Sequence, residues 1–190
     1  MRILTILVFA VSAAAIYWLV SRPAVPKSYV ESYREALRTQ PGSELAIDLG
    51  VERFRQAFSD LSSTATRDRF LALYAERMYF HDTLKHFERR EMLADYMGAM
   101  AKTIEASEVE IDQVIRDRAD VYLRWTMRFE IRAVGRPLMS DTIGMTHVRF
   151  NEQGEVVLHQ DFWDPASGLY RQLPVIGWVL DRVDRRLDQG

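Results

Sequence analysis

The chain has 190 residues, of which 48% are apolar and 27% are charged, and it contains no cysteine. This composition is typical of one globular domain and excludes a disulfide scaffold, a zinc–thiolate site and a collagen-like repeat. The formal net charge is −2, and residues 23–190 carry 23 basic and 27 acidic side chains. That balance disfavours nucleic acid as a partner, because binding to phosphates needs a positive face.

Residues 3–20 form an apolar segment without a charge, close to the roughly 20 residues that a helix needs to span a bilayer. We therefore expect residues 1–22 to be a single-pass membrane anchor. The alternative is a cleaved signal peptide, with Arg2 at its start and small residues for cleavage at Ala13–Ala15. The apolar run continues past that point, which favours a retained anchor. Basic residues flank both ends of the segment, so the side of the membrane that carries the domain is undecided.

Residues 23–44 are expected to form a linker and a juxtamembrane helix. Pro23 and Pro26 prevent the anchor helix from continuing. Ser28 is a suitable N-cap for a short helix that ends before Pro41. The apolar stripe of this helix is thin, so we expect it to pack weakly.

The main domain is predicted to cover residues 45–170 and to begin with helices. Asp48 is placed to cap a helix with apolar residues at helical spacing, and residues 62–66 offer caps for the next one. Residues 78–82 indicate a short strand or extended turn. A further helix is predicted from about residue 87 to residue 106.

The hydrophobic period changes from helical to two in the second half of the domain. Apolar and polar residues alternate from Val121 to Arg132, so this strand is expected to bury one face. Strands are also predicted at residues 143–150 and 156–163, joined by a turn in which Gly154 supplies a positive φ. Helices followed by antiparallel strands indicate an α+β domain with helices on one face of the sheet.

Residues 171–190 are predicted to be a C-terminal amphipathic helix that begins at Pro174. Its apolar stripe runs from Ile176 to Leu187. We expect this stripe to cover apolar surface, either on the domain or at the bilayer.

Two stretches of the chain resemble the nuclear transport factor 2-like superfamily, which includes ketosteroid isomerase and SnoaL-like proteins. The first is Leu71–Glu76 running into Phe80–Asp82, and the second is Val148–Gly154 running into Gln160–Trp163. The resemblance covers roughly residues 45–165. It implies a cone-shaped, curved antiparallel sheet with helices on its concave side and one pocket between them. The same fold carries many unrelated functions, so the reaction does not follow from it.

The resemblance places Asp82 on the general-base aspartate of the isomerase, although Thr83 stands where that family has proline. The alternative role for Asp82 is an ordinary turn or N-cap residue. Phe54 or Phe58 stands at the position of the isomerase's oxyanion tyrosine, and Thr146 at its second oxyanion donor. Phenylalanine cannot donate a hydrogen bond, so steroid isomerisation is not expected. These residues are instead predicted to line a ligand pocket.

His159, Asp161 and Trp163 are two residues apart, so all three point to the same face of their strand. The resemblance implies that this face lines the pocket, where His159 with Asp161 or Asp82 forms an acid/base pair. The alternative is that His159 and Asp161 pair with Arg124 or Arg128 on the solvent side of the sheet. No cofactor motif and no metal-binding spacing is present in the sequence.

The sequence thus predicts a membrane-tethered domain that binds a small, partly apolar molecule in a single pocket. The first alternative is an acid/base enzyme of the isomerase, cyclase or hydrolase type that uses Asp82 and His159. The second alternative is a non-catalytic assembly module, since the basic face of the sheet is either solvated or a homodimer surface. The expected partners are a small-molecule ligand and the membrane, through residues 3–20.

Overall fold

The computed structural model describes residues 11–12, 17, 29–133 and 136–188. Residues 1–32 and residues 33–190 form two separate units, and the second unit is an α+β domain. No helix within the described residues is long and apolar enough to cross a membrane. The predicted anchor at residues 3–20 lies outside the described residues except at positions 11, 12 and 17, so it stays a prediction.

Within the described residues, four helices precede or interrupt the sheet, and two helices with a 3-10 turn follow it. The first set is α2 (Tyr29–Thr39), α3 (Ile47–Phe58), α4 (Thr66–Leu73) and α5 (Arg90–Ala101). The second set is α6 (Pro165–Gly168), the turn at Tyr170–Gln172 and α7 (Pro174–Leu187). Asp48 does not cap α3 as predicted, because the helix begins one residue before it, and its carboxylate pairs with Arg116 instead.

The sheet is mixed, which corrects the prediction of a purely antiparallel one. Its strands are β1 (Tyr74–His81), β2 (His86–Arg89), β3 (Ile104–Asp117), β4 (Asp120–Ala133), β5 (Arg136–Phe150) and β6 (Val156–Trp163). They lie in the order β2-β1-β6-β5-β4-β3, and only β1 and β6 run parallel to each other. The helix predicted from residue 87 to residue 106 is shorter, because main-chain pairing takes its first residues into β2 and its last into β3.

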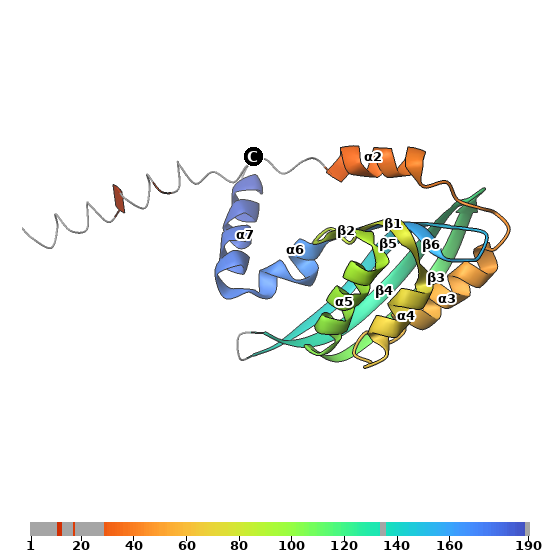
Figure 1. The fold of residues 1–190 in the computed structure, drawn as a ribbon. Coiled ribbons are helices and arrows are strands. Elements are labelled where there is room, and N and C mark those ends of the chain that lie inside the picture. The colour runs from red at the N-terminus through yellow and green to blue at the C-terminus, as the bar shows by residue number, and fades with distance from the viewer. Residues whose placement is uncertain (1–10, 13–16, 18–28, 134–135, 189–190) are drawn as a thin grey trace, which may run out of the picture. The chain divides into compact units, whose positions relative to one another are not determined.

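The core lies between the sheet and helices α3, α4 and α5, which Figure 1 shows on the same face of the sheet. Phe54, Phe70 and Leu93 from the helices are almost completely buried against residues such as Leu123 and Phe150 of the sheet. Each such side chain contributes about 1.5–3 kcal/mol by leaving water. The predicted alternation in β4 is confirmed over its first half, where Val121, Leu123 and Trp125 belong to this core.

Helix α2 packs against the opposite face of the sheet, where residues Tyr33, Ala36 and Leu37 contact Tyr79 and Leu158. The predicted helix is therefore present, but it is held more firmly than expected. Polar contacts between α2 and strand β5 account for this firm packing.

His147 connects α2 to the sheet through both of its ring nitrogens. Its Nδ1 atom lies 2.6 Å from the hydroxyl of Tyr33, and its Nε2 atom lies 2.7 Å from Oδ1 of Asp120. Arg149 donates to the same carboxylate and to the carbonyls of Leu37 and Gln40 at the end of α2. Burial lowers the pKa of His147, although the hydrogen bond to Asp120 opposes this. The end of α2 is thus fixed by partly buried polar groups that have hydrogen-bond partners.

Helix α7 begins at Pro174 as predicted, but its apolar stripe is exposed. Trp178 is 59% exposed and Leu187 is 73% exposed. The contacts that fix α7 are polar, since Arg171 pairs with Asp181 and Asp184. The expectation that α7 covers apolar surface of the domain is therefore not met within the described chain.

Candidate functional site

A cavity of about 290 Å³ lies between the sheet and the helices that cover it. The alternation of β4 builds one wall, because Trp125, Met127, Phe129 and Ile131 are two residues apart and point inward. Aromatic rings from α3, β1, α5 and β6 complete much of the lining: Phe54, Phe58, Phe80, Tyr96 and Trp163. The cavity is apolar over most of its surface, and two aspartates stand out in its lining.

Asp82 lies in the turn that follows β1. Its Oδ1 atom accepts hydrogen bonds from the backbone N–H groups of Leu84, at 2.8 Å, and Lys85, at 2.6 Å. The alternative role as a turn residue is thus realised, and the same side chain also lines the cavity. Burial raises the pKa of Asp82, and the nearby Asp161 adds to this, whereas the two backbone donors lower it.

Thr83 shapes this turn in a conformation that is unusual for its residue type. Its φ is 71°, in the left-handed region that β-branched side chains avoid. The buried hydroxyl of Thr83 has no hydrogen-bond partner among the described residues. Strain of this kind costs on the order of 1–3 kcal/mol, and it is stored here next to a cavity-lining acid.

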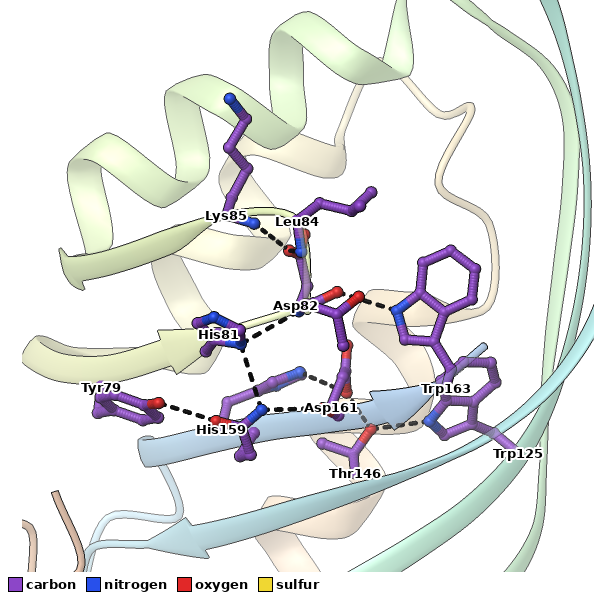
Figure 2. A network of polar contacts seen from close by, with 12 residues as sticks. Tyr79, His81, Asp82, Leu84, Lys85, Trp125, Thr146, His159, Asp161 and Trp163 are labelled. Carbon is purple, nitrogen blue, oxygen red and sulfur yellow. Dashed lines mark hydrogen bonds and ion pairs between the residues drawn. The ribbon is translucent and has the colours of Figure 1, made fainter. Parts of the chain in front are cut away.

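Asp161 lies on β6, where two donors converge on one of its oxygens (Figure 2). The hydroxyl of Thr146 donates to Oδ1, and Nε2 of His159 lies 2.9 Å from the same atom. Thr146 in turn accepts a hydrogen bond from the indole N–H of Trp125 at 2.8 Å. The carboxylate is therefore held in a fixed orientation in the cavity wall.

His159 lies behind this wall and does not line the cavity. Its side chain is fully buried, with the ring of Phe80 at a centroid distance of 4.6 Å. Nδ1 lies 2.9 Å from the hydroxyl of Tyr74. A neutral imidazole satisfies both contacts, since one nitrogen accepts from the tyrosine and the other donates to Asp161. The histidine therefore orients Asp161 and reaches a ligand only through it.

Trp163 connects the two aspartates. It lies on β6 two residues after Asp161, and its indole N–H donates to the backbone carbonyl of Asp82 at 2.9 Å. Its side chain also lines the cavity. The same side chain thus forms part of the apolar wall and holds the turn that carries Asp82.

The structure brings all the predicted site residues except His159 to the cavity wall: Phe54, Phe58, Asp82, Thr146, Asp161 and Trp163. His159 makes its pair with Asp161, and no hydrogen bond joins it to Asp82 within the described residues. The alternative pairing on the solvent side is not found, because Arg124 is near Asp112 and Arg128 pairs with Asp141.

Three residues of the site were not predicted as functional. Trp125 belongs to the predicted buried face of its strand. Its hydrogen bond to Thr146 depends on the register between β4 and β5, which the pattern of one strand does not contain. Tyr74 starts β1, and its hydroxyl reaches His159 on β6, a contact between strands that are far apart in the sequence. Tyr96 lies within the helix predicted at residues 87–106, and it lines the cavity from α5.

Comparison with known proteins identifies the fold. A sequence model of the SnoaL-like domain family matches residues 51–159. A search among curated proteins found no match.

Several solved structures are similar to the chain. An epoxide hydrolase from M. tuberculosis, described as LEH-like, has a TM-score of 0.54 at 19% identity, and the alignment covers 67% of this chain and 89% of that one. A SnoaL-like polyketide cyclase assigned in Jannaschia sp. has a TM-score of 0.53 at 16% identity, with 67% and 92% covered. A protein from Catenulispora acidiphila with a ketosteroid isomerase-like fold, in complex with trimethylamine, has a TM-score of 0.52 at 19% identity, with 63% and 88% covered. At these identities the similarity shows a shared fold.

Proposed function

The chain belongs to the SnoaL-like domain family, and on this premise we propose that it binds a small, mostly apolar molecule whose polar end is held by Asp82 and Asp161. The observation that carries the proposal is the cavity itself, an aromatic and aliphatic chamber with two carboxylates in its wall. Its volume is near the lower end of the range of about 300–1,000 Å³ for ligand sites. A molecule with one ring and a short polar chain fits this description.

A water-soluble probe tests this proposal directly. We expect 3-phenylpropan-1-ol to bind the full chain with a Kd of roughly 0.01–1 mM in a calorimetric titration, given the affinity that ten non-hydrogen atoms supply. Val109 lines the cavity, and its neighbour Glu110 is exposed. Val109→Phe should fill the cavity and weaken binding at least about tenfold, whereas Glu110→Phe should bind as the wild type does. Equal binding by both variants would contradict the proposal.

An acid/base enzyme is the second candidate, and one observation favours it. The two cavity acids have different environments: burial raises the pKa of Asp82, while Asp161 accepts two hydrogen bonds from side chains. Such a pair supplies a proton donor and a proton acceptor to the same molecule. The sequence-based role of His159 as a catalytic base shifts here to positioning Asp161.

Hydrolysis of an apolar epoxide is a suitable reaction for testing the acid/base candidate, because one similar structure is described as an epoxide hydrolase. Asp161 would accept a proton from a water molecule while the oxygen of that water bonds to the epoxide carbon. The carbon–oxygen bond would break, and Asp82 would protonate the released oxygen to give a diol. We expect diol formation from styrene oxide to fall about 100-fold or more in Asp161→Asn. Wild-type formation at the rate in buffer alone would count against this candidate.

We further propose that residues 3–20 tether the domain to a membrane as a single-pass anchor. The support is the uncharged segment of 18 residues, which continues past the small residues Ala13–Ala15. The intact mass of the protein from the membrane fraction should correspond to a chain that retains residues 1–22. A mature chain that begins near residues 16–22 would overturn this.

A further inference from the structure

The cavity has a one-sided charge. Among the described residues that line it, Asp82 and Asp161 are acidic, and no lysine, arginine or histidine side chain is present. Figure 2 shows the side chain of Lys85 extending away from both carboxylates. His159 touches Asp161 from behind the wall, with Nε2 at 2.9 Å from Oδ1, and its side chain does not line the cavity. Two acids therefore share an apolar chamber without a basic residue inside it.

The hydrogen-bond donors around these acids are already used by the protein. The indole N–H of Trp125 donates to Thr146, the hydroxyl of Thr146 donates to Asp161, and the indole N–H of Trp163 donates to a backbone carbonyl. The hydroxyl of Thr103 also donates to a backbone carbonyl. Within the described chain, the hydroxyl of Tyr96 is the lining donor without such a partner.

The acceptors, in contrast, are only half used. Oδ1 of Asp82 and Oδ1 of Asp161 each accept two hydrogen bonds. No described residue donates a hydrogen bond to Oδ2 of either carboxylate. A ligand that enters the cavity therefore meets oxygen acceptors, and it satisfies them best with N–H or O–H donors.

Charge adds to this preference. A buried carboxylate is costly unless an opposite charge or several donors accompany it, and two neighbouring carboxylates raise the cost for each other. Aromatic rings attract cations through their faces, and seven lining residues are aromatic: Phe54, Phe58, Phe80, Tyr96, Trp125, Phe129 and Trp163. A metal ion is a poor occupant, because calcium takes six to eight oxygen ligands and the wall is mostly hydrocarbon.

We propose that the ligand of this cavity is a small organic cation, an amine that carries its positive charge to Asp82 and Asp161 while its apolar body lies against the aromatic wall. This inference rests on the proposed function of the cavity as a binding site and specifies the chemical class of its ligand. The same arrangement excludes carboxylates, phosphates and sulfates, because an anion would be desolvated next to two acids with few donors available.

Three probes of nearly the same shape separate the contribution of charge to the binding affinity from the contribution of apolar contact. They are 3-phenylpropylamine, 3-phenylpropan-1-ol and 3-phenylpropanoate, which are cationic, neutral and anionic at neutral pH. In calorimetric titrations of the full chain, we expect the amine to bind at least about tenfold more tightly than the alcohol, as charge-assisted hydrogen bonds do. The anion should show no measurable binding.

Substitution of the acids tests where the preference arises. In Asp161→Asn the new side chain keeps an oxygen that accepts from Thr146 and His159, so the wall is retained. The variant should lose most of the preference for the amine over the alcohol, and the ratio of the two affinities is the quantity to compare with the wild type. Asp82→Asn should reduce the preference in the same way. Asp141→Asn is the matched control, because Asp141 is 70% exposed and pairs with Arg128 outside the cavity.

The outcomes distinguish this inference from the proposed function. Equal affinity for amine and alcohol would overturn the inference and leave the binding function standing. A preference that survives in both Asp82→Asn and Asp161→Asn would overturn it as well, because the charge would then be recognised elsewhere. If none of the three probes binds, the proposed binding function fails and the inference fails with it.

Discussion

Replacement of His159 by alanine should strongly destabilise the fold, although the residue does not line the cavity. The imidazole is fully buried and joins Tyr74 on β1 to Asp161 on β6. Removal of the ring leaves a void of roughly 60 Å³, which costs about 1.5 kcal/mol at ~24 cal/mol per Å³. The Tyr74 hydroxyl is left buried without a partner, at about 1–3 kcal/mol. We expect the free energy of unfolding to fall by about 3–4 kcal/mol.

Urea denaturation followed by tryptophan fluorescence measures this change, because Trp125 and Trp163 lie next to the network. The midpoint should decrease with little change in the m-value. Tyr74→Phe should cost about 1–2 kcal/mol, and the two changes together should cost less than their sum, since both remove the same hydrogen bond. His86→Ala is the matched control, because this histidine is exposed on β2. A loss below about 1 kcal/mol in His159→Ala would refute the reasoning.

Four further changes have expected outcomes. In Gly144→Ala the new Cβ would lie 2.3 Å from the ring of Trp125, so calorimetric melting should show a loss of about 2 kcal/mol, and an unchanged Tm would contradict the close packing. Thr83→Gly should raise stability by about 1 kcal/mol in urea titrations, since glycine accepts the φ of 71° and removes an unpaired hydroxyl; a decrease would argue against strain. Burial raises the pKa of Asp82 above its unfolded value near 3.8, so its contribution to stability is present at lower pH and is lost as the pH rises through the folded pKa. Asp82→Asn should therefore gain in Tm relative to the wild type between about pH 4 and about pH 7, and a constant difference would contradict this. Deletion of residues 174–190 should change the Tm by less than about 3 °C, because the apolar stripe of α7 is exposed, and a collapse of the fold would show that the helix is needed.

The elements that the sequence predicts well are those whose pattern is local. The alternation in β4 and the turn before β6 depend on neighbouring residues, and both are found with nearly the predicted bounds. Gly154 has the positive φ that its turn requires. Proline at the start of α7 likewise marks the helix by its fixed φ.

The elements that were predicted poorly depend on partners far away in the chain. Strand β2 has four residues, three of them exposed, so its strand conformation follows from pairing with β1. Ile104 continues the helical spacing of α5, yet it starts β3 because it pairs with Ile131. The tertiary partner overrides the local pattern in both cases.

The sequence predicted which residues belong to the candidate site better than it predicted which of them contact one another. The period of two brings Asp161 and Trp163 to one face of β6, and the structure places both on the cavity wall. The same rule groups His159 with them, but the ring is covered by Tyr74 and Phe80, which come from β1. Which of several residues on one face reaches the open space depends on neighbouring strands, and a single strand's pattern does not contain that information.

The parallel pairing of β1 and β6 makes the cavity a late product of folding. Phe80 pairs with His159 across about 80 residues, and a newly made chain completes β1 long before β6 exists. Non-local pairing of this kind slows folding, because a long loop must close before the contacts form. Asp82 follows β1 and Asp161 lies on β6, so the two acids meet only when the last strand inserts between β1 and β5. A chain that stops before residue 156 lacks β6, and with it Asp161 and Trp163 of the cavity wall.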